Sequence, residues 1–342
     1  MQNFNTYSSV IVTGTLAYDE IMDFPGYFKD YFHPEKLHQI NVSFALSKIE
    51  KQLGGTGLNI AYNTNFALQN KISVNLLGAI GKDGSKFIQF LKKNKMSTNG
   101  VLIDKTRYSA TGKVITDKND NQIWGFYYGA CEKAKEIQLN KFADKQSLII
   151  ISADYPDAFL NYQKQVIENK LSYIYDPGMS LTWIKDTDLK EGIMHSTYLI
   201  GNDYEIAMIL KRLNISIQQL IKKGIKIITT LGEKGVRYEF AESPLRSSSF
   251  EGQAKVHPPS HKATEGHSKV HKVKSYKVKK IIDPTGAGDA WRGGFIAGLV
   301  SQKPIVDCLK LGNVMASFAV ESYGTVNHKP SQTQILSRFS TL

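Results

Sequence analysis

Short apolar runs alternate with amphipathic segments along most of the chain. The runs are rich in β-branched residues, and the segments between them carry apolar residues at helical spacing, as in 84–94 and 203–213. This alternation predicts βαβ units and a mostly parallel sheet with helices on both faces, which is an α/β fold. The runs expected to form strands are 10–13, 74–80, 148–152, 173–176, 198–201 and 225–231.

Two stretches, 15–50 and 107–128, depart from this rhythm. They alternate apolar and polar residues in strand fashion and contain few helix signals. We therefore expect a small antiparallel sheet outside the main one, and over the carboxyl edge of the main sheet it would serve as a lid. Alternation places Phe126 and Tyr128 on one face of this lid and Tyr127 on the other.

The net charge of +12 is concentrated in one polar segment. Between 244 and 280 there are nine Lys and Arg residues and only two acids, which accounts for +7 of the net charge. Residues 243–273 are rich in Ser, Pro, Lys and His, and they contain too little apolar surface to offset the entropy of ordering. A metal-binding or nucleic-acid-binding arm is one interpretation. We favour a flexible basic insertion, because its histidine spacings match no standard zinc site, and we expect no nucleic-acid partner.

Two cysteines, Cys131 and Cys308, are the only ones in the chain, and no CxxC motif occurs. A disulfide scaffold or cysteine-built zinc site is therefore not expected, and the composition fits a reducing cytoplasm. The apolar run at 10–12 has the length of a strand and lacks the features of a secretory signal, so we expect no membrane association. The length is sufficient for one large α/β domain.

The stretch IIDPTGAGDAWRGGF, residues 281–295, combines a strand-like run, two glycines and an acid at a predicted helix start. It is neither a Walker A loop nor a convincing dinucleotide fingerprint, because Gly-Lys-Ser/Thr and a third glycine are missing. Its backbone N–H groups could converge on an anion. Asp289 is either a helix cap or a base, and an acid beside an anion site makes sense if it faces a hydroxyl that attacks a phosphoryl group.

Four motifs resemble those of the ribokinase-like (PfkB) carbohydrate and nucleoside kinases, and they occur along the chain in the order that this family has. They are the 283–290 signature, Gly54-Gly55 with Asn59 four residues on, Asn202-Asp-Tyr-Glu205, and 230–235. The resemblance implies a three-layer α/β/α core with a β-sheet lid. It also implies that Asp289 is the general base and that Gly286, Ala287 and Gly288 form the anion hole.

The resemblance places the phosphoryl acceptor near the first strand. Asp19 would accept hydrogen bonds from vicinal sugar hydroxyls, which suits a carboxylate with two acceptor oxygens. Gly54 and Gly55 would let the backbone approach the sugar, and Asn59 would add a polar contact. The plainer alternatives are a solvated loop acid at Asp19, with Asp23 as a competitor, and a simple strand-to-helix turn at the glycines.

The donor side of the resemblance implies ATP and Mg²⁺. Residues implied to bind ATP are Asn202, Thr230, Gly232, Gly235 and Asn313. Glu205 would order Mg²⁺ through water, although Asn202 and Glu205 also have the spacing of a capping box. Asp283 and Thr285 match the monovalent-cation (K⁺) site of many relatives, or else form a turn held by side-chain hydrogen bonds.

The acceptor suggested by the aromatic lid is a purine nucleoside. Trp124, Phe126, Tyr127 and Tyr128, with Phe24, Tyr27 and Phe44 from the first lid segment, could hold a base. The details are most similar to the bacterial adenosine kinases of the family, which implies phosphorylation of the adenosine 5′-hydroxyl in purine salvage by a monomer or homodimer. A sugar or sugar-phosphate kinase is the alternative, and a catalytically idle nucleic-acid-binding kinase fold is a further one.

Overall fold

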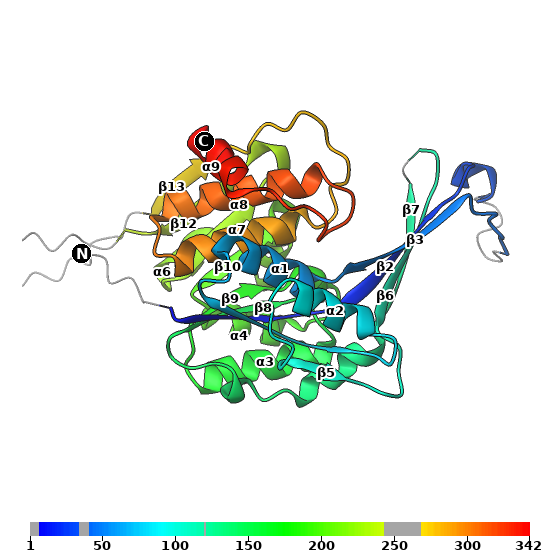
Figure 1. The fold of residues 1–342 in the computed structure, drawn as a ribbon. Coiled ribbons are helices and arrows are strands. Elements are labelled where there is room, and N and C mark those ends of the chain that lie inside the picture. Colours follow the sequence, from blue (N-terminus) through cyan, green and yellow to red (C-terminus); the bar gives the residue numbers. More distant parts are fainter. Residues whose placement is uncertain (1–6, 34–40, 120, 243–267) are drawn as a thin grey trace, which may run out of the picture.

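The computed structural model describes residues 7–33, 41–119, 121–242 and 268–342. In these residues nine strands form one large sheet, in the order β13-β12-β11-β10-β9-β8-β1-β4-β5 (Figure 1). Its parallel strands are β1 (Ser9–Thr13), β4 (Ser73–Ile80), β5 (Val101–Ile103), β8 (Ser147–Ser152), β9 (Tyr173–Asp176), β10 (Tyr198–Asn202) and β11 (Lys226–Thr230). An antiparallel hairpin, β12 (Val236–Ala241) and β13 (Ser268–Val273), completes one edge.

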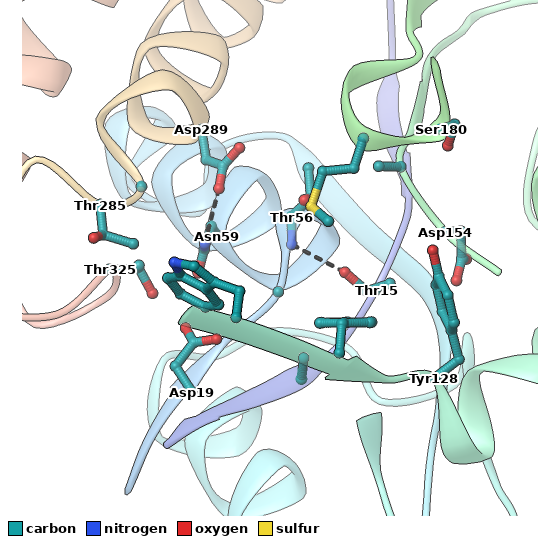
Figure 2. A pocket seen from close by; sticks show the side chains of 17 residues that line it. Thr15, Asp19, Thr56, Asn59, Tyr128, Asp154, Ser180, Thr285, Asp289 and Thr325 are labelled. Atoms are coloured by element: carbon teal, nitrogen blue, oxygen red, sulfur yellow. Dashed lines mark hydrogen bonds between the residues drawn. The ribbon is translucent and has the colours of Figure 1, made fainter. Parts of the chain in front are cut away.

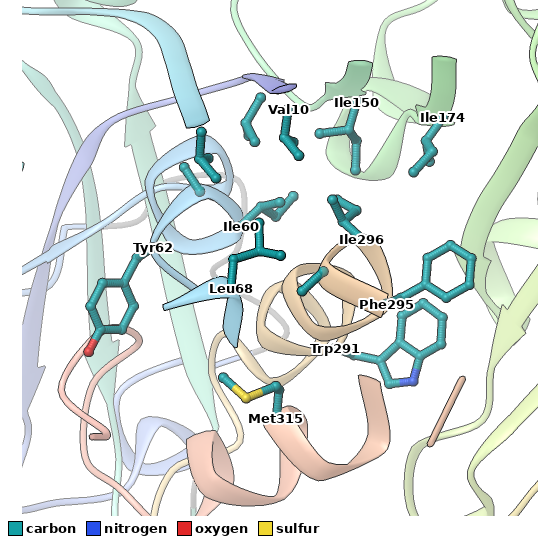
Figure 3. Packing of buried hydrophobic residues seen from close by; sticks show 14 of the residues in the cluster. Val10, Ile60, Tyr62, Leu68, Ile150, Ile174, Trp291, Phe295, Ile296 and Met315 are labelled. Atoms are coloured by element: carbon teal, nitrogen blue, oxygen red, sulfur yellow. The ribbon is translucent and has the colours of Figure 1, made fainter. Parts of the chain in front are cut away.

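Helices cover both faces of this sheet. They are α1 (Thr56–Leu68), α2 (Ser85–Lys93), α3 (Pro156–Glu168), α4 (Asp186–Met194), α5 (Asp203–Leu213), α6 (Ile217–Lys222), α7 (Ala287–Val300), α8 (Ile305–Val320) and α9 (Gln332–Ser340). Successive strand residues point to opposite faces. Val10 therefore packs with α1, α7 and α8 on one side (Figure 3), while Ile11 packs with α3 to α6 on the other. The predicted three-layer α/β/α core is confirmed.

A second sheet of four strands projects from the end of the large one (Figure 1). Its order is β3 (Lys48–Gly54), β2 (Ala17–Asp23), β6 (Ala110–Thr116) and β7 (Gln122–Tyr127). The predicted small sheet is therefore present. It is mixed and not purely antiparallel, because β2 and β6 run parallel. The chain returns to β6 only after passing through α1, β4, α2 and β5, and such a crossover permits a parallel pair.

The predicted strands of the core all appear, but two local predictions were wrong. Residues 281–283 form no strand, and Ile281 and Ile282 are 60% and 53% exposed, because no neighbouring strand pairs with them. Residues 268–273 were assigned to the flexible insertion and instead form β13, which pairs along its length with β12. Edge strands tolerate such polar sequence. The rest of the predicted insertion, 243–267, lies outside the described residues.

No helix in the described parts of the chain combines the length and the apolar character needed to cross a bilayer.

Candidate active site

A pocket of about 420 Å³ lies between the carboxyl edge of the large sheet and the inner face of the small sheet. Figure 2 shows Asp289, Asn59, Thr285 and Thr325 at one end, and Asp154, Ser180 and Tyr128 at the other. The carboxyl edge of an open parallel sheet is where ligands generally bind in α/β folds. The first of these two ends holds residues of the 283–290 signature.

Asp289 lies in the first turn of α7 and is held by a neighbour from α1. Asn59 Nδ2 donates a 2.8 Å hydrogen bond to Asp289 Oδ2. Burial raises the pKa of Asp289 to about 6, although the nearby Arg292 and the Asn59 hydrogen bond act in the opposite direction. A carboxylate with this pKa is a better proton acceptor at neutral pH than an ordinary aspartate, and it is still ionised there.

The turn before α7 is built by Gly286. This residue has φ 75°, in the left-handed region, and a Cβ on it would lie 2.8 Å from Thr325 Cβ. Only glycine fits this backbone and this close approach without strain. The turn leaves the first N–H groups of α7, including those of Gly288 and Asp289, without acceptors inside the helix, so they can bind an anion.

Sequence reasoning did not find the buried ion pair beside Asp289. Arg292, one turn along α7, donates from Nη2 to Asp176 Oδ1 at 2.7 Å, and its Nε also contacts this carboxylate. Both side chains are buried, with 7% and 2% of their surface exposed. Asp176 ends strand β9, and acids at the carboxyl ends of parallel strands were the available signal.

Asp19 faces the pocket from strand β2 of the small sheet. It fits between two glycines, because a Cβ on Gly54 would lie 2.1 Å from Asp19 Oδ2, and one on Gly112 would lie 3.3 Å from Oδ1. Burial, followed by the charges of Asp289 and Asp283, raises the pKa of Asp19 to about 7. A carboxyl group in this position would gain from ligand hydroxyl donors that replace lost water.

Gly55 and Asn59 come from the loop and helix that follow β3. Gly55 has φ 95°, and a Cβ there would lie 2.5 Å from the carbonyl oxygen of Thr15. Thr56 N–H donates to Thr15 Oγ1 at 3.1 Å, which ties this turn to the end of β1. The structure therefore brings the predicted acceptor-side residues Asp19, Gly55 and Asn59 into the same pocket as Asp289.

Trp124, Phe126 and Tyr128 form an aromatic wall in the pocket. The rings of Phe126 and Tyr128 meet edge to face with centroids 5.0 Å apart. Trp124 is 52% exposed and Phe126 is 37% exposed, which leaves flat apolar surface for a ligand.

The aromatics of the first lid segment behave differently. The rings of Phe24 and Phe44 pack on each other, with centroids 4.7 Å apart, and neither residue lines the pocket.

Two residues predicted to bind ATP lie at the ends of neighbouring strands. Asn202 and Thr230 are register partners on β10 and β11. Asn202 and Glu205 form a complete capping box, with Glu205 N–H donating to Asn202 Oδ1 and Asn202 N–H donating to Glu205 Oε2, each at 2.8 Å. The loop after β11 has left-handed glycines at Gly232 (φ 57°) and Gly235 (φ 94°).

Two other predicted residues already have protein partners. Asn313 accepts a hydrogen bond from Trp291 Nε1 at 2.8 Å and donates one to the Lys274 carbonyl at 2.7 Å, so its amide links α7, α8 and the segment after β13. Asp283 accepts hydrogen bonds from the N–H groups of Thr285 at 2.9 Å and Gly324 at 3.0 Å. These contacts match the plainer interpretation of Asp283 as a turn-forming residue.

Comparison with known proteins identifies the family. The model of the pfkB family of carbohydrate kinases matches residues 17–332, and the chain therefore belongs to this family and is a kinase. It is 28% identical over 314 residues to a nucleoside kinase of Methanocaldococcus jannaschii, which covers 90% of this chain and 93% of that one. A ribokinase of Lactococcus lactis is 24% identical over 303 residues, covering 84% and 86%.

A solved structure with the same fold is that of a nucleoside kinase of Burkholderia thailandensis in complex with inosine. It has a TM-score of 0.79 and 25% sequence identity to this chain, and the match covers 97% of each.

Proposed function

We propose that this protein transfers the γ-phosphoryl group of ATP to the 5′-hydroxyl of a purine nucleoside, with adenosine as an acceptor. The observation that carries the proposal is the arrangement of one pocket, in which Asp289 comes from helix α7 and Asp19 from strand β2 of the small sheet, and an aromatic wall lies between them and Asp154. A nucleoside has a 5′-hydroxyl, a ribose diol and a flat nucleobase. In this pocket Asp289 can accept the hydroxyl proton, Asp19 can accept hydrogen bonds from the diol, and the aromatic wall can stack on the nucleobase.

Asp289 accepts the proton of the attacking hydroxyl as the new P–O bond forms, and Asn59 fixes the orientation of its carboxylate. The N–H groups of Gly286, Gly288 and Asp289 face the transferring phosphoryl group, whereas that of Ala287 donates to the Pro284 carbonyl at 3.2 Å. The helix dipole of α7 adds favourable potential for the charge of this group. Asp19 accepts hydrogen bonds from the ribose hydroxyls. Catalysis then consists of positioning and electrostatic stabilisation, as phosphoryl transfer requires.

Mg²⁺ would neutralise charge on the ATP phosphates, and Glu205 is the residue that we expect to hold it through water. The described residues contain no group of three or more Asp, Glu, His or Cys that could cage a metal. This fits Mg²⁺, which keeps several waters and is bound by one or two carboxylates together with phosphates. The charge of Glu205 acts on both Asp289 and Arg292, so a cation bound at Glu205 would lower the pKa of Asp289.

ATP would lie along the carboxyl ends of β10 and β11, over the glycine loop at 232–235. Asn202 and Thr230 border this surface. Asn313 would shape it indirectly, through the segment after β13 that it holds. A monovalent cation such as K⁺ at Asp283 and Thr285 would share a carboxylate that already accepts two backbone N–H groups, and it would use the lone pairs that these bonds leave free.

Nucleoside specificity is favoured over a sugar acceptor by the character of the small sheet. A free sugar has no aromatic ring to stack on Trp124 and Phe126, whose rings are partly exposed. A sugar phosphate would need a cationic cluster in the pocket wall, and the described residues that line it include no Lys or Arg. Relatives named nucleoside kinase and the inosine-bound structural neighbour support the same choice.

The assignment of Asp289 is tested by Asp289→Asn. We expect kcat to fall by a factor on the order of 10³, while adenosine binding measured by calorimetry stays nearly unchanged, because the amide keeps the shape and loses the basicity. Retention of about a tenth of wild-type turnover would show that Asp289 is not the base.

The acceptor is tested by a screen with radiolabelled ATP against adenosine, inosine, ribose and fructose 6-phosphate. We expect the two nucleosides to be phosphorylated with the highest kcat/KM. Phosphorylation of fructose 6-phosphate but not of adenosine would replace this proposal by a sugar-phosphate kinase. Loss of all activity on small molecules, with salt-dependent nucleic-acid binding, would point to the idle kinase fold.

A further inference from the structure

The end of the pocket opposite Asp289 contains a buried acid with an unused oxygen. Asp154 follows strand β8 and is 2% exposed. Its Oδ1 accepts a 2.8 Å hydrogen bond from the Tyr155 N–H. Its Oδ2 is buried and has no hydrogen-bond partner among the described residues. Asp154 lines the pocket beside Tyr128, as Figure 2 shows.

A second buried polar group without a partner lies at the same end. Ser180 is 1% exposed, lines the pocket in the short helix that follows β9, and its Oγ has no hydrogen-bond partner in the described part of the chain. The neighbours Ala153 and Met179 are apolar. Two unsatisfied polar groups in an apolar wall are the usual arrangement of a site that orients a ligand by a few hydrogen bonds.

No cation among the residues that the structure describes balances Asp154. None of the described Lys and Arg residues forms an ion pair with it, and the titratable groups that interact with it electrostatically are Tyr128, Cys131 and Tyr162. Burial therefore raises the pKa of Asp154 to about 8. A buried carboxylate without a counter-charge is costly, and a proton on Oδ2 removes this cost.

We propose that Asp154 is the residue that recognises the nucleobase, acting as a neutral carboxylic acid whose Oδ2–H donates a hydrogen bond to a ring nitrogen of a purine, with Ser180 Oγ as a second polar contact. This inference rests on the proposed nucleoside kinase function, because it concerns the same pocket. The ribose and its 5′-hydroxyl lie toward Asp19 and Asp289, and the base extends along the aromatic wall to Asp154. Purines that present an unprotonated ring nitrogen at this end are the preferred class.

The variant Asp154→Asn distinguishes two states of Asp154. One is a neutral acid that donates a hydrogen bond to the nucleobase, and the other is a carboxylate that accepts one from it. Since Oδ1 already accepts from the Tyr155 N–H, the amide oxygen of the new side chain takes this position and the amide nitrogen replaces Oδ2. The variant Asp154→Asn therefore keeps a donor toward the base. Asp154→Ala removes the group altogether.

The experiment measures KM and kcat of the full chain for adenosine and for its 1-deaza, 3-deaza and 7-deaza analogues. We expect Asp154→Asn to keep KM within about threefold, and Asp154→Ala to raise it by about tenfold or more with little change in kcat, as for loss of one buried hydrogen bond. One deaza analogue should show a similar rise with the wild-type enzyme and no further rise with Asp154→Ala. Calorimetry with the same ligands on the Asp289→Asn background measures binding without turnover.

Three results would overturn the inference. They are an unchanged adenosine KM in Asp154→Ala, a loss in Asp154→Asn as large as in Asp154→Ala, and equal KM values for adenosine and all three deaza analogues. Each of these is measurable while the enzyme still phosphorylates adenosine, so each contradicts the inference alone. Absence of any nucleoside binding or phosphorylation by the wild-type protein would overturn the proposed function as well.

Discussion

Arg292 Nη2 donates a 2.7 Å hydrogen bond to Asp176 Oδ1, which joins the first half of α7 to the end of β9. The pair affects the neighbouring Asp289 in two opposite ways. The positive charge of Arg292 lowers the pKa of Asp289, and the negative charges of Asp176 and Glu205 raise it. Burial is the main cause of the raised pKa of Asp289, and this buried pair adjusts that pKa in both directions, so Arg292 and Asp176 are positioning residues for Asp289.

Removing each partner should shift the pH profile of kcat in opposite directions. In Arg292→Gln the lost positive charge raises the pKa of Asp289, so the acidic limb of the profile moves to higher pH. In Asp176→Asn the lost negative charge lowers this pKa, and the limb moves to lower pH. The measurement is kcat against pH from about 5 to 9. The midpoint of the acidic limb gives the pKa of the base in the enzyme–substrate complex.

Breaking a buried ion pair also costs stability, by about 3–5 kcal/mol. Both single variants should therefore melt at lower temperature, and the double variant Arg292→Gln/Asp176→Asn should recover part of the loss. A merely structural pair would lower activity in both single variants without separating their pH profiles. Shifts in the same direction would contradict the electrostatic account.

The space that Gly54 leaves for Asp19 predicts a specific effect of a single methyl group. In Gly54→Ala the new Cβ would overlap Asp19 Oδ2, at 2.1 Å, and displace the carboxyl group. We expect KM for adenosine to rise about tenfold, because one or two hydrogen bonds to the diol are lost. Gly125→Ala in the same sheet is the matched control, because nothing lies within 4 Å of a Cβ there, and its KM should stay within about twofold.

The diol itself provides the second readout for this variant. KM for 2′,3′-dideoxyadenosine, which lacks both hydroxyls, should be nearly the same in the wild type and in Gly54→Ala. An equal rise for adenosine and for its dideoxy analogue would show that the methyl group disturbs the pocket generally, and that Asp19 does not bind the diol.

The sequence was sufficient to predict the layers of the fold, and several residues that it proposed for the site line one pocket. The local pattern of apolar and polar residues predicts a strand correctly where the run also pairs with neighbouring strands. This is the case for β1 and β8 at the centre of the sheet. The glycines at 55 and 286 marked turns because their φ angles lie in the left-handed region, and Gly54 leaves space for the Asp19 side chain. The strand predicted at 281–283 failed because an apolar run alone does not provide a pairing partner.

Asp154, Asp176 and Arg292 were not predicted because an acid or a base acquires its role from burial and from partners distant in sequence. Asp176 and Arg292 are separated by 116 positions and meet only in the folded chain. Asp154 resembles many other acids that follow strands. Only the structure shows that its Oδ2 is enclosed and unpaired.

Trp124 offers a direct signal of nucleoside binding. It lines the pocket with 52% of its surface exposed, whereas Trp291 is 3% exposed in the core. Adenosine or inosine stacked on the aromatic wall should cover Trp124 and shift or quench its fluorescence. The change should disappear in Trp124→Phe while binding measured by calorimetry persists. An undiminished fluorescence change in Trp124→Phe would place the base elsewhere.

The protonated state proposed for Asp154 predicts how stability depends on pH. The pKa of this group is about 8 in the folded protein and 3.8 ordinarily, so between these values the folded state holds a proton that the unfolded state has lost. Unfolding free energy then falls as pH rises, by at most about 1.4 kcal/mol per pH unit from this group. A side-chain amide cannot ionise, so Asp154→Asn should gain stability relative to the wild type as pH increases from 5 to 8.

The comparison is made by thermal melting at pH 5, 6, 7 and 8 without nucleoside. Asp19 and Asp289 also have raised pKa values and contribute with the same sign, and His328, whose pKa burial lowers to about 4, contributes with the opposite sign. These contributions are common to both proteins and cancel in the difference between their Tm values. Asp30→Asn at an exposed position is the control and should show a constant difference. A difference for Asp154→Asn that does not change with pH would mean that Asp154 is ionised in the folded protein.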